Sequence, residues 1–277
     1  MNLLEIRHVN YQYETGGQAL QDLSLTFEKG KTTVLLGANG AGKSTLFLNI
    51  LGILHPQSGE IRFDGQPCGT SRKEMTALRS RIGLVFQDPD DQIFSADVRQ
   101  DIAFGPLNLG LSQEETRKRV EQAARQTGVY ELLDRPVQAL SFGQKKRVAI
   151  AGVLAMRPEL IILDEPTAGL DPAGVSGIME LLSDIKKEAG TTIAIATHDI
   201  DLVPLYCDYA YVLSHGQAIC AGTPEEIFAQ PALLRAHGLR LPRIAHLMEI
   251  LEEKDHMDVR RVSTIGGARR EIKRLFS

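Results

Sequence analysis

Three short apolar runs limit the folds open to this chain more than any other feature. They occupy residues 32–37, 159–164 and 191–196 and consist mainly of Val, Ile, Leu, Ala and Thr. Near-continuous apolar runs of this length are typical of parallel strands that are buried on both faces. A turn follows each run, and segments with helical spacing fill the intervals. The sequence therefore predicts an α/β fold around a mostly parallel sheet.

Two other segments show different patterns. Residues 3–27 alternate between apolar and polar side chains, which indicates antiparallel strands at the edge of that sheet. Residues 95–156 are rich in Glu, Gln, Arg and Ala with helical spacing, and they contain no strand-like run. Within them, Ser112 followed three residues later by Glu115 is typical of a helix start. We interpret this segment as a helical subdomain that is inserted into the sheet domain.

The last part of the chain has its own helical pattern and a local excess of Lys and Arg, and the pair Gly266-Gly267 indicates a loop within it. We therefore divide the chain into a core that holds the parallel sheet and a β subdomain, an inserted helical subdomain and a C-terminal extension. The predicted limits of these three parts are 1–94 with 157–230, 95–156, and 231–277.

Charge and cysteine content argue against several classes of protein. The formal net charge of −4 over 277 residues is unlike that of a general nucleic-acid binder, which would be basic. Cys68, Cys207 and Cys220 lie far apart without a CxxC pair, which favours a reducing cytosol over a disulfide framework or a zinc site. No apolar run approaches the roughly 18 residues that span a bilayer, and a signal-peptide pattern is absent. We expect any membrane role to depend on docking to a membrane-spanning chain.

Residues 37–44 match the phosphate-loop pattern G-x-x-x-x-G-K-[ST]. The matching residues are Gly37, Ala38, Asn39, Gly40, Ala41, Gly42, Lys43 and Ser44. Glycines let the backbone approach phosphate oxygens, successive N–H groups form an anion-binding nest, and the helix that begins near Lys43 adds its dipole. We expect Lys43 to contact the β- and γ-phosphates and the Ser44 hydroxyl to bind Mg²⁺. Only ~0.01 chance matches are expected in such a chain, which disfavours a Gly-rich turn without function.

Two carboxylates end the second apolar run. Asp164 and Glu165 directly follow residues 160–163, and ligands of open α/β sheets bind at the carboxyl ends of strands. Asp164 is predicted to hold the Mg²⁺ shell, as the corresponding acid does in P-loop ATPases. Glu165 is predicted to orient or polarise the attacking water. A buried strand that ends in acids is a weak signal by itself, and it becomes strong downstream of a phosphate loop.

Polar residues follow two more strand-like runs. His198 comes shortly after the run 191–196, and Gln87 comes directly after the run 82–86. A lone histidine is more often structural than catalytic, but its place at the nucleotide edge of the sheet predicts contact with the γ-phosphate and the water. Gln87 is predicted to reach the metal or the water while it senses a partner, although a glutamine after a strand means little when taken alone.

The order of these motifs resembles that of the ABC ATPase family. Residues 140–144, Leu-Ser-Phe-Gly-Gln, resemble its signature motif and lie shortly before the Asp164 strand. Residues 168–171, Ala-Gly-Leu-Asp, resemble its D-loop, and Tyr13 matches the aromatic residue that stacks on adenine, for which Tyr11 is a weaker candidate. The resemblance covers about residues 3 to 235. It implies a P-loop NTPase (RecA-like) core of parallel strands with an antiparallel β edge and an inserted α-helical subdomain.

The same resemblance implies a dimer, most simply of two identical subunits, that encloses two ATP molecules. Each ATP would lie between the phosphate loop of one subunit and the signature of the other. Ser141 would begin a helix aimed at the γ-phosphate across the interface, and Gly143 would permit close backbone approach. ATP would hold the dimer closed until hydrolysis releases it. ATP and Mg²⁺ are the implied cofactors, and the resemblance adds three nucleotide-binding residues, Thr45, Gln144 and Asp171.

A narrower resemblance comes from residues 85–94, Val-Phe-Gln-Asp-Pro-Asp-Asp-Gln-Ile-Phe, which look like the ATPases of energy-coupling-factor importers. Residues 103–110 and 141–147 are similar to the cobalt and nickel branch. This implies coupling to an integral-membrane scaffold and a substrate-capture subunit, as a peripheral protein on the cytoplasmic face of the cell (inner) membrane. The histidines and cysteines lack metal-ligand spacing, so the cobalt or nickel cargo follows from the resemblance alone. An importer of another micronutrient, such as a vitamin, stays open.

Two charged segments have more than one interpretation. Asp88, Asp90 and Asp91 are a solvated loop or, in our hypothesis, a set of partners for Arg residues on the scaffold. The basic residues of the tail form a solvated face, a contact with anionic lipid headgroups or a dimer contact, and we favour the dimer contact.

Rival functions leave some motifs without a role. Chromosome-maintenance and repair ATPases carry a long coiled coil between phosphate loop and signature, whereas residues 45–139 lack sustained heptads. Translation-associated ATPases usually carry two cassettes, and this chain has one. A P-loop kinase for small molecules would leave the signature, the D-loop and His198 unused. We therefore favour a transporter ATPase that has no nucleic-acid partner.

Overall fold

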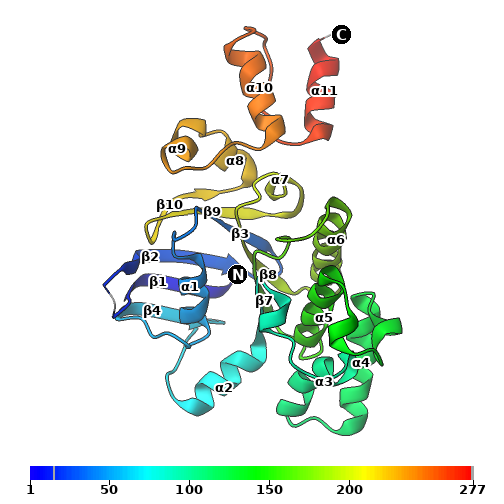
Figure 1. Cartoon of the computed structure of the whole chain (residues 1–277). Coiled ribbons are helices and arrows are strands. Elements are labelled where there is room, and N and C mark those ends of the chain that lie inside the picture. Colours follow the sequence, from blue (N-terminus) through cyan, green and yellow to red (C-terminus); the bar gives the residue numbers. More distant parts are fainter. Residues whose placement is uncertain (15, 276–277) are drawn as a thin grey trace.

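A six-stranded, mostly parallel sheet forms the centre of the computed structural model, which describes residues 1–14 and 16–275 (Figure 1). Its strand order is β10-β9-β3-β8-β7-β6, and only β10 runs antiparallel to its neighbour. The strands are β3 (Thr32–Leu36), β6 (Ile82–Val85), β7 (Leu160–Asp164), β8 (Thr192–Thr197), β9 (Tyr209–Ser214) and β10 (Gln217–Gly222). Every residue of β3 and β8 is buried, because both faces of the sheet are covered. The three strands predicted from the apolar runs are confirmed.

A second, antiparallel sheet packs against one face of the first. Its order is β2-β1-β4-β5, with β1 (Asn2–Gln12), β2 (Gln18–Glu28), β4 (Ser58–Phe63) and β5 (Gln66–Pro67). The antiparallel pairing predicted for residues 3–27 is confirmed, but its place at the edge of the parallel sheet is wrong. Burial alternates along β1 and β2, so one face is apolar and covers helix α1 (Lys43–Ile50) and the parallel strands. The antiparallel edge of the parallel sheet is β10 instead.

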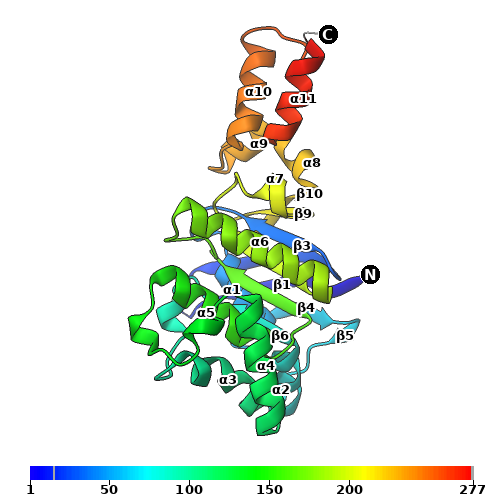
Figure 2. The same cartoon turned by 90° about the vertical axis from the view of Figure 1, so that its right-hand side faces the viewer.

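Helices of the middle of the chain lie beyond β6 and β7 (Figure 2). They are α2 (Arg72–Arg81), α3 (Val98–Asn108), α4 (Gln113–Gln126) and α5 (Phe142–Leu154), with short 3-10 turns η1 (Pro89–Asp91), η2 (Tyr130–Leu132) and η3 (Val137–Ala139). The helix start at Ser112 is confirmed, because its hydroxyl accepts a hydrogen bond from the backbone N–H of Glu115. The Glu115 carboxylate forms an ion pair with the Arg119 guanidinium group at 2.7 Å.

The remaining helices follow the D-loop and the last strands. They are α6 (Pro172–Ala189), α7 (Val203–Tyr206), α8 (Pro224–Phe228), α9 (Pro231–Ala236), α10 (Arg243–Glu253) and α11 (Ile265–Leu275). Helices α10 and α11 stand side by side and project from the sheets (Figures 1 and 2), around a small core of their own. No helix within residues 1–14 and 16–275 is long and apolar enough to cross a membrane.

The loop predicted at Gly266-Gly267 is wrong, because both glycines lie in the first turn of α11. The hydroxyl of Thr264 accepts a hydrogen bond from the Gly267 N–H at 3.1 Å and so caps this turn. A Cβ at Gly267 would meet the Val262 side chain at 3.0 Å. Close packing at a helix start therefore explains this glycine. Of the predicted extension, residues 276 and 277 lie outside the described residues.

The three cysteines are free thiols that are each partly covered. Burial raises the pKa of Cys68 to about 11 and that of Cys207 to about 12. Burial also raises the pKa of Cys220. All three thiols are therefore protonated near neutral pH.

Candidate functional site

The phosphate loop, residues 37–44, connects β3 to α1 at the carboxyl end of the parallel sheet. Gly42 has a φ of 102°, and a Cβ there would meet the backbone oxygen of Ala19 at 2.5 Å, so only glycine fits. The ammonium group of Lys43 donates hydrogen bonds to the carbonyls of Gly37 at 2.6 Å and Ala38 at 3.2 Å. Burial lowers the pKa of Lys43, partly offset by Glu165 and Asp164. The backbone of the loop thus surrounds the ammonium group of Lys43.

Ser44 and Asp164 come from different elements and meet at this loop. The Ser44 hydroxyl donates a hydrogen bond of 2.7 Å to the Asp164 carboxylate at the end of β7. Burial raises the pKa of Asp164, and the bond from Ser44 opposes this rise. Hydroxyl and carboxylate oxygens are hard donors that suit Mg²⁺, which keeps several waters and binds through phosphates. No cluster of three or more His, Cys, Asp or Glu that could hold a metal occurs in the part of the chain described. The pair therefore fits a magnesium ion that is shared with a nucleotide.

Glu165 is the centre of a polar cluster next to Asp164. Its buried carboxylate lies 2.9 Å from Nδ1 of His198 and accepts a hydrogen bond of 3.0 Å from the Thr197 hydroxyl. The backbone of Glu165 has a φ of 45°, which is rare for a non-glycine residue and marks stored strain. The His198 side chain is 67% exposed. One nitrogen of the ring therefore holds Glu165 while the rest of the ring faces outward.

Tyr13 lies beside the phosphate loop. Its hydroxyl is 3.0 Å from the Thr45 hydroxyl on α1, and its ring meets that of Tyr11 edge-on, with centroids 5.1 Å apart. The Tyr13 side chain is partly exposed, as stacking of its ring on a ligand requires. The structure thus brings both Tyr13 and Thr45, as predicted site residues, to this loop.

The signature and D-loop residues cap two helices. The Ser141 hydroxyl accepts the Gln144 N–H at 3.4 Å, and the Gln144 side chain accepts the Ser141 N–H at 2.9 Å, which closes a capping box at the start of α5. The helix start predicted at Ser141 is confirmed. Asp171 caps α6 by accepting the Gly174 N–H at 2.7 Å. Gly143 lies in the first turn of α5, where a Cβ would approach the Leu170 side chain.

The predicted residues therefore fall into two groups. The phosphate loop, Asp164, Glu165 and His198 meet at one edge of the sheet. Ser141 and Gln144 form no hydrogen bond with that edge in the described residues, and Ser141 is exposed. Gln87 is exposed two residues after the end of β6, and its backbone carbonyl accepts a hydrogen bond from Lys146.

Residues that sequence reasoning missed are Thr197, Lys146 and Gln92. Thr197 directly precedes His198 at a strand end, which is a local signal that could have drawn attention to it. Lys146 and Gln92 act through contacts between distant segments, so no local pattern marks them.

Four large apolar side chains within residues 86–107 are exposed, and we call them the aromatic patch: Phe86, Phe94, Phe104 and Leu107. Phe94 is 66% exposed, and its ring meets that of Phe104 edge-on with centroids 4.6 Å apart. The neighbouring acids have different roles. Asp88 accepts the Asp90 N–H at 2.9 Å and caps η1. Asp90 is paired with Lys145 at 2.6 Å within the chain.

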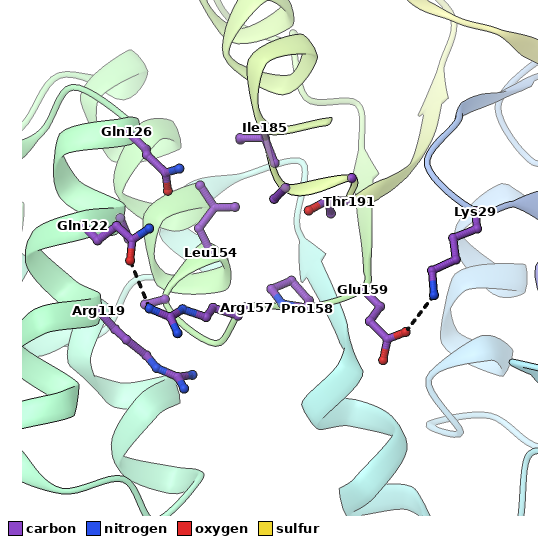
Figure 3. Close-up of a pocket in the computed structure, with 14 residues that line it drawn as sticks. Lys29, Arg119, Gln122, Gln126, Leu154, Arg157, Pro158, Glu159, Ile185 and Thr191 are labelled. Carbon is purple, nitrogen blue, oxygen red and sulfur yellow. Dashed lines mark hydrogen bonds and ion pairs between the residues drawn. The ribbon is translucent and has the colours of Figure 1, made fainter. Parts of the chain in front are cut away.

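A cavity of about 380 Å³ lies far from this chemistry (Figure 3). Its lining includes Arg119 and Arg157 from the helical region and Glu159, which directly precedes β7. Asp164 is at the opposite end of that strand, so the cavity is separate from the phosphate loop. Its charged side chains already have partners, because Arg119 pairs with Glu115 and Glu159 with Arg81.

These elements define a P-loop nucleotide triphosphatase with a signature helix that is exposed at its start. Residues 20–168 match the family model of the ABC transporter. The energy-coupling factor transporter ATP-binding protein EcfA3 of Clostridium perfringens is 55% identical over 271 residues, which cover 98% of this chain and 95% of that protein. The chain therefore belongs to the ABC transporter family, among its energy-coupling factor ATP-binding proteins.

Solved structures agree with this assignment. The structure of cbiO1 from Clostridium perfringens, described as part of the ABC transporter complex cbiONQ, matches with a TM-score of 0.79 and 55% identity, covering 90% of this chain and 99% of that one. A dimeric post-hydrolysis state of the ATP-binding cassette MJ0796, bound to ADP and Pi, matches with a TM-score of 0.73 and 28% identity, covering 80% and 98%. The predicted fold class and ATPase activity are confirmed.

Proposed function

We propose that this chain powers the import of cobalt or nickel ions by hydrolysing ATP between two copies of itself. The observation that carries the proposal is the division of the site. The phosphate loop, Asp164 and Glu165 share one edge of the sheet, whereas Ser141 is exposed at the start of a capped helix and forms no hydrogen bond with them in the described segments. A second copy supplies the signature that each phosphate loop lacks. The relative of known structure that is dimeric with ADP and Pi supports this arrangement.

Each group of residues has a task at the bound nucleotide. Tyr13 stacks on adenine, and the backbone of residues 37–45 surrounds the phosphates. Lys43 exchanges its carbonyl partners for the β- and γ-phosphates. Ser44 and Asp164, with Gln87 as a further contact, hold Mg²⁺, which neutralises phosphate charge when it is bound. The second copy contributes three signature residues and one D-loop residue: Ser141, Gly143, Gln144 and Asp171.

Hydrolysis then depends on Glu165. Its carboxylate orients the water that attacks the γ-phosphorus and receives a proton as the bond to the bridging oxygen breaks, which yields ADP and phosphate. His198 and Thr197 fix both oxygens of this carboxylate before ATP arrives, so little reorganisation is needed. The outward-facing part of His198 contacts the γ-phosphate.

The aromatic patch and the neighbouring acids form the proposed docking surface for the membrane scaffold. Exposed aromatic side chains are typical anchors of protein interfaces. We hypothesise that acids among Asp88, Asp90 and Asp91 pair with Arg residues of the scaffold. Two of the three already have a role within the chain, because Asp88 caps η1 and Asp90 pairs with Lys145. Asp91 is exposed and is the acid best placed to meet an Arg of the scaffold.

Uptake measurements test the proposed function. Radioactive cobalt and nickel are offered to vesicles that contain this chain and its neighbouring membrane subunits, with ATP inside the compartment that holds the chain. We expect uptake with the wild-type chain and none with Glu165→Gln. Uptake of a vitamin in place of both metals would assign the alternative importer class, and failure of the chain to co-purify with any membrane subunit would support a soluble role.

The docking surface is tested by Phe94→Arg, which places a charge in the aromatic patch. We expect this variant to lose co-purification with the membrane subunits while its ATPase activity in solution persists. The matched control is Leu205→Arg on α7, because Leu205 is similarly exposed, at 61%, and helix α7 lies away from α3 in both views (Figures 1 and 2). Co-purification of Phe94→Arg at the wild-type level would reject this surface.

A further inference from the structure

The Gln87 loop, defined here as residues 86–92, is tied to the signature helix α5 by a buried lysine. Lys146 lies two residues after the signature, its side chain is fully buried, and its ammonium group donates a hydrogen bond to the backbone carbonyl of Gln87. These two residues are 59 positions apart in the chain. The contact therefore joins two segments that the sequence places far from each other, and Figure 2 shows α5 beside β6, which leads into the loop.

Two further contacts strengthen the same connection. The side chain of Gln92 accepts the Phe86 N–H at 3.0 Å and donates to the Ala149 carbonyl of α5 at 3.3 Å. Lys145 pairs with Asp90 at 2.6 Å on the surface. The loop is thus held to α5 at its start and along η1.

The burial of Lys146 has a cost that packing alone does not explain. Taking an ammonium group out of water is unfavourable, and an apolar side chain of similar volume often packs equally well in such a place. Burial lowers the pKa of Lys146, whereas the charges of Asp88, Asp164 and Glu165 oppose this effect. The negative charges that act on the lysine thus come both from the Gln87 loop and from the hydrolytic carboxylates.

We propose that Lys146 is a positioning residue that couples the two ATP sites of the dimer through each subunit. The inference rests on the proposed function, in which Ser141 of α5 serves the partner's ATP and Gln87 serves the subunit's own ATP. When Ser141 engages the γ-phosphate across the interface, α5 shifts, and Lys146 moves the Gln87 carbonyl with it. ATP bound at one site of the dimer thereby positions the Gln87 side chain that serves the other site. Such coupling makes hydrolysis cooperative in ATP concentration.

The test compares variants of the full chain in steady-state hydrolysis of Mg²⁺-ATP. Lys146→Met keeps the length of the side chain without its donor, Lys146→Arg keeps charge and donors, and Lys118→Met repeats the substitution on an exposed lysine of α4. For Lys146→Met we expect a ten- to hundred-fold lower kcat from misplacement of Gln87. We expect KM to change by less than about twofold, because the phosphate loop is untouched. We also expect a Hill coefficient near one.

Each result decides the proposal. Restored kcat and cooperativity in Lys146→Arg, with Lys118→Met like the wild type, support it. Wild-type cooperativity in Lys146→Met overturns it. Equal losses of kcat and cooperativity in Lys146→Met and Lys146→Arg that follow the melting temperatures of the two variants also overturn it. If Lys146→Met does not fold, Gln92→Leu cuts an independent contact of the same loop, and unchanged cooperativity there also overturns the proposal. A wild-type chain that fails to hydrolyse ATP would reject the proposed function itself.

Discussion

Glu165 illustrates how single residues prepare this site for chemistry. Its left-handed backbone is a conformation that costs free energy, and its buried carboxylate is held by hydrogen bonds on both oxygens. The surrounding structure maintains this geometry without help from a substrate. A carboxylate fixed in this way can orient a water molecule more effectively than a mobile one.

Glu165→Gln removes the proton acceptor and keeps the shape of the side chain. We expect the rate of ATP hydrolysis to fall by about 10²–10⁴-fold, with little change in ATP affinity, because the phosphate loop is intact. With ATP the variant should accumulate as a closed dimer, measured by light scattering. Glu180→Gln on the exposed face of α6 is the control. Near wild-type hydrolysis by Glu165→Gln would show that another group activates the water.

The C-terminal elements are joined by a charged pair between α9 and α10. Arg235 donates two hydrogen bonds to Glu249, one of them at 2.9 Å, and the Glu249 side chain is 5% exposed. The hydrogen bonds from Arg235 lower the pKa of Glu249. A bidentate pair of this kind fixes the angle between two helices more firmly than a single contact.

The stability of this junction should depend on pH. Because the pKa of Glu249 is lower in the folded chain than its ordinary value of 4.5, the pair stabilises the fold fully above that value. Its contribution is lost as the pH falls from there through the lowered native pKa. We expect Glu249→Gln to reduce the free energy of unfolding by about 1–3 kcal/mol at neutral pH. The difference from the wild type should shrink in acid.

Denaturant unfolding at several pH values, with the exposed Glu225→Gln on α8 as the control, measures this effect. A loss of stability in Glu249→Gln that is the same at every pH would show that the charge of Glu249 is not the source of the stabilisation.

Local features of these elements were predictable from sequence, and their long-range arrangement was not. Ser112 and Ser141 cap helices as expected, because a cap depends on residues three positions away. Alternation in residues 3–27 predicted antiparallel strands, but it could not show which sheet they join. Gly266-Gly267 was misread as a loop, because the packing of Gly267 against Val262 that favours glycine is a contact of the folded tail. The Lys146 to Gln87 contact leaves no mark in either segment.

At the scale of the whole molecule, the divided site can be tested by mixing subunits. In our proposal, a dimer of Lys43→Ala with Ser141→Arg contains one site that lacks both residues and one site that is complete. Neither variant alone forms a complete site. We therefore expect ATP hydrolysis to reappear on mixing, at less than half of the wild-type rate per dimer, because the coupling inferred above lowers turnover at a single intact site.

The mixture must be compared with each variant at the same total concentration, since dimer formation depends on concentration. Phosphate release is the measurement. No recovery in a mixture that demonstrably forms dimers would place Lys43 and Ser141 in the same subunit's site.

The covered cysteines of this chain have a practical consequence. A thiol reacts with alkylating dyes as its thiolate, and thiols with pKa values of about 11 and 12 contain almost none of it at neutral pH. One new cysteine on an exposed helix, such as α4, would therefore take up a fluorophore in preference to the native thiols. The opening and closing of two labelled copies could then be followed by energy transfer in an otherwise unaltered chain.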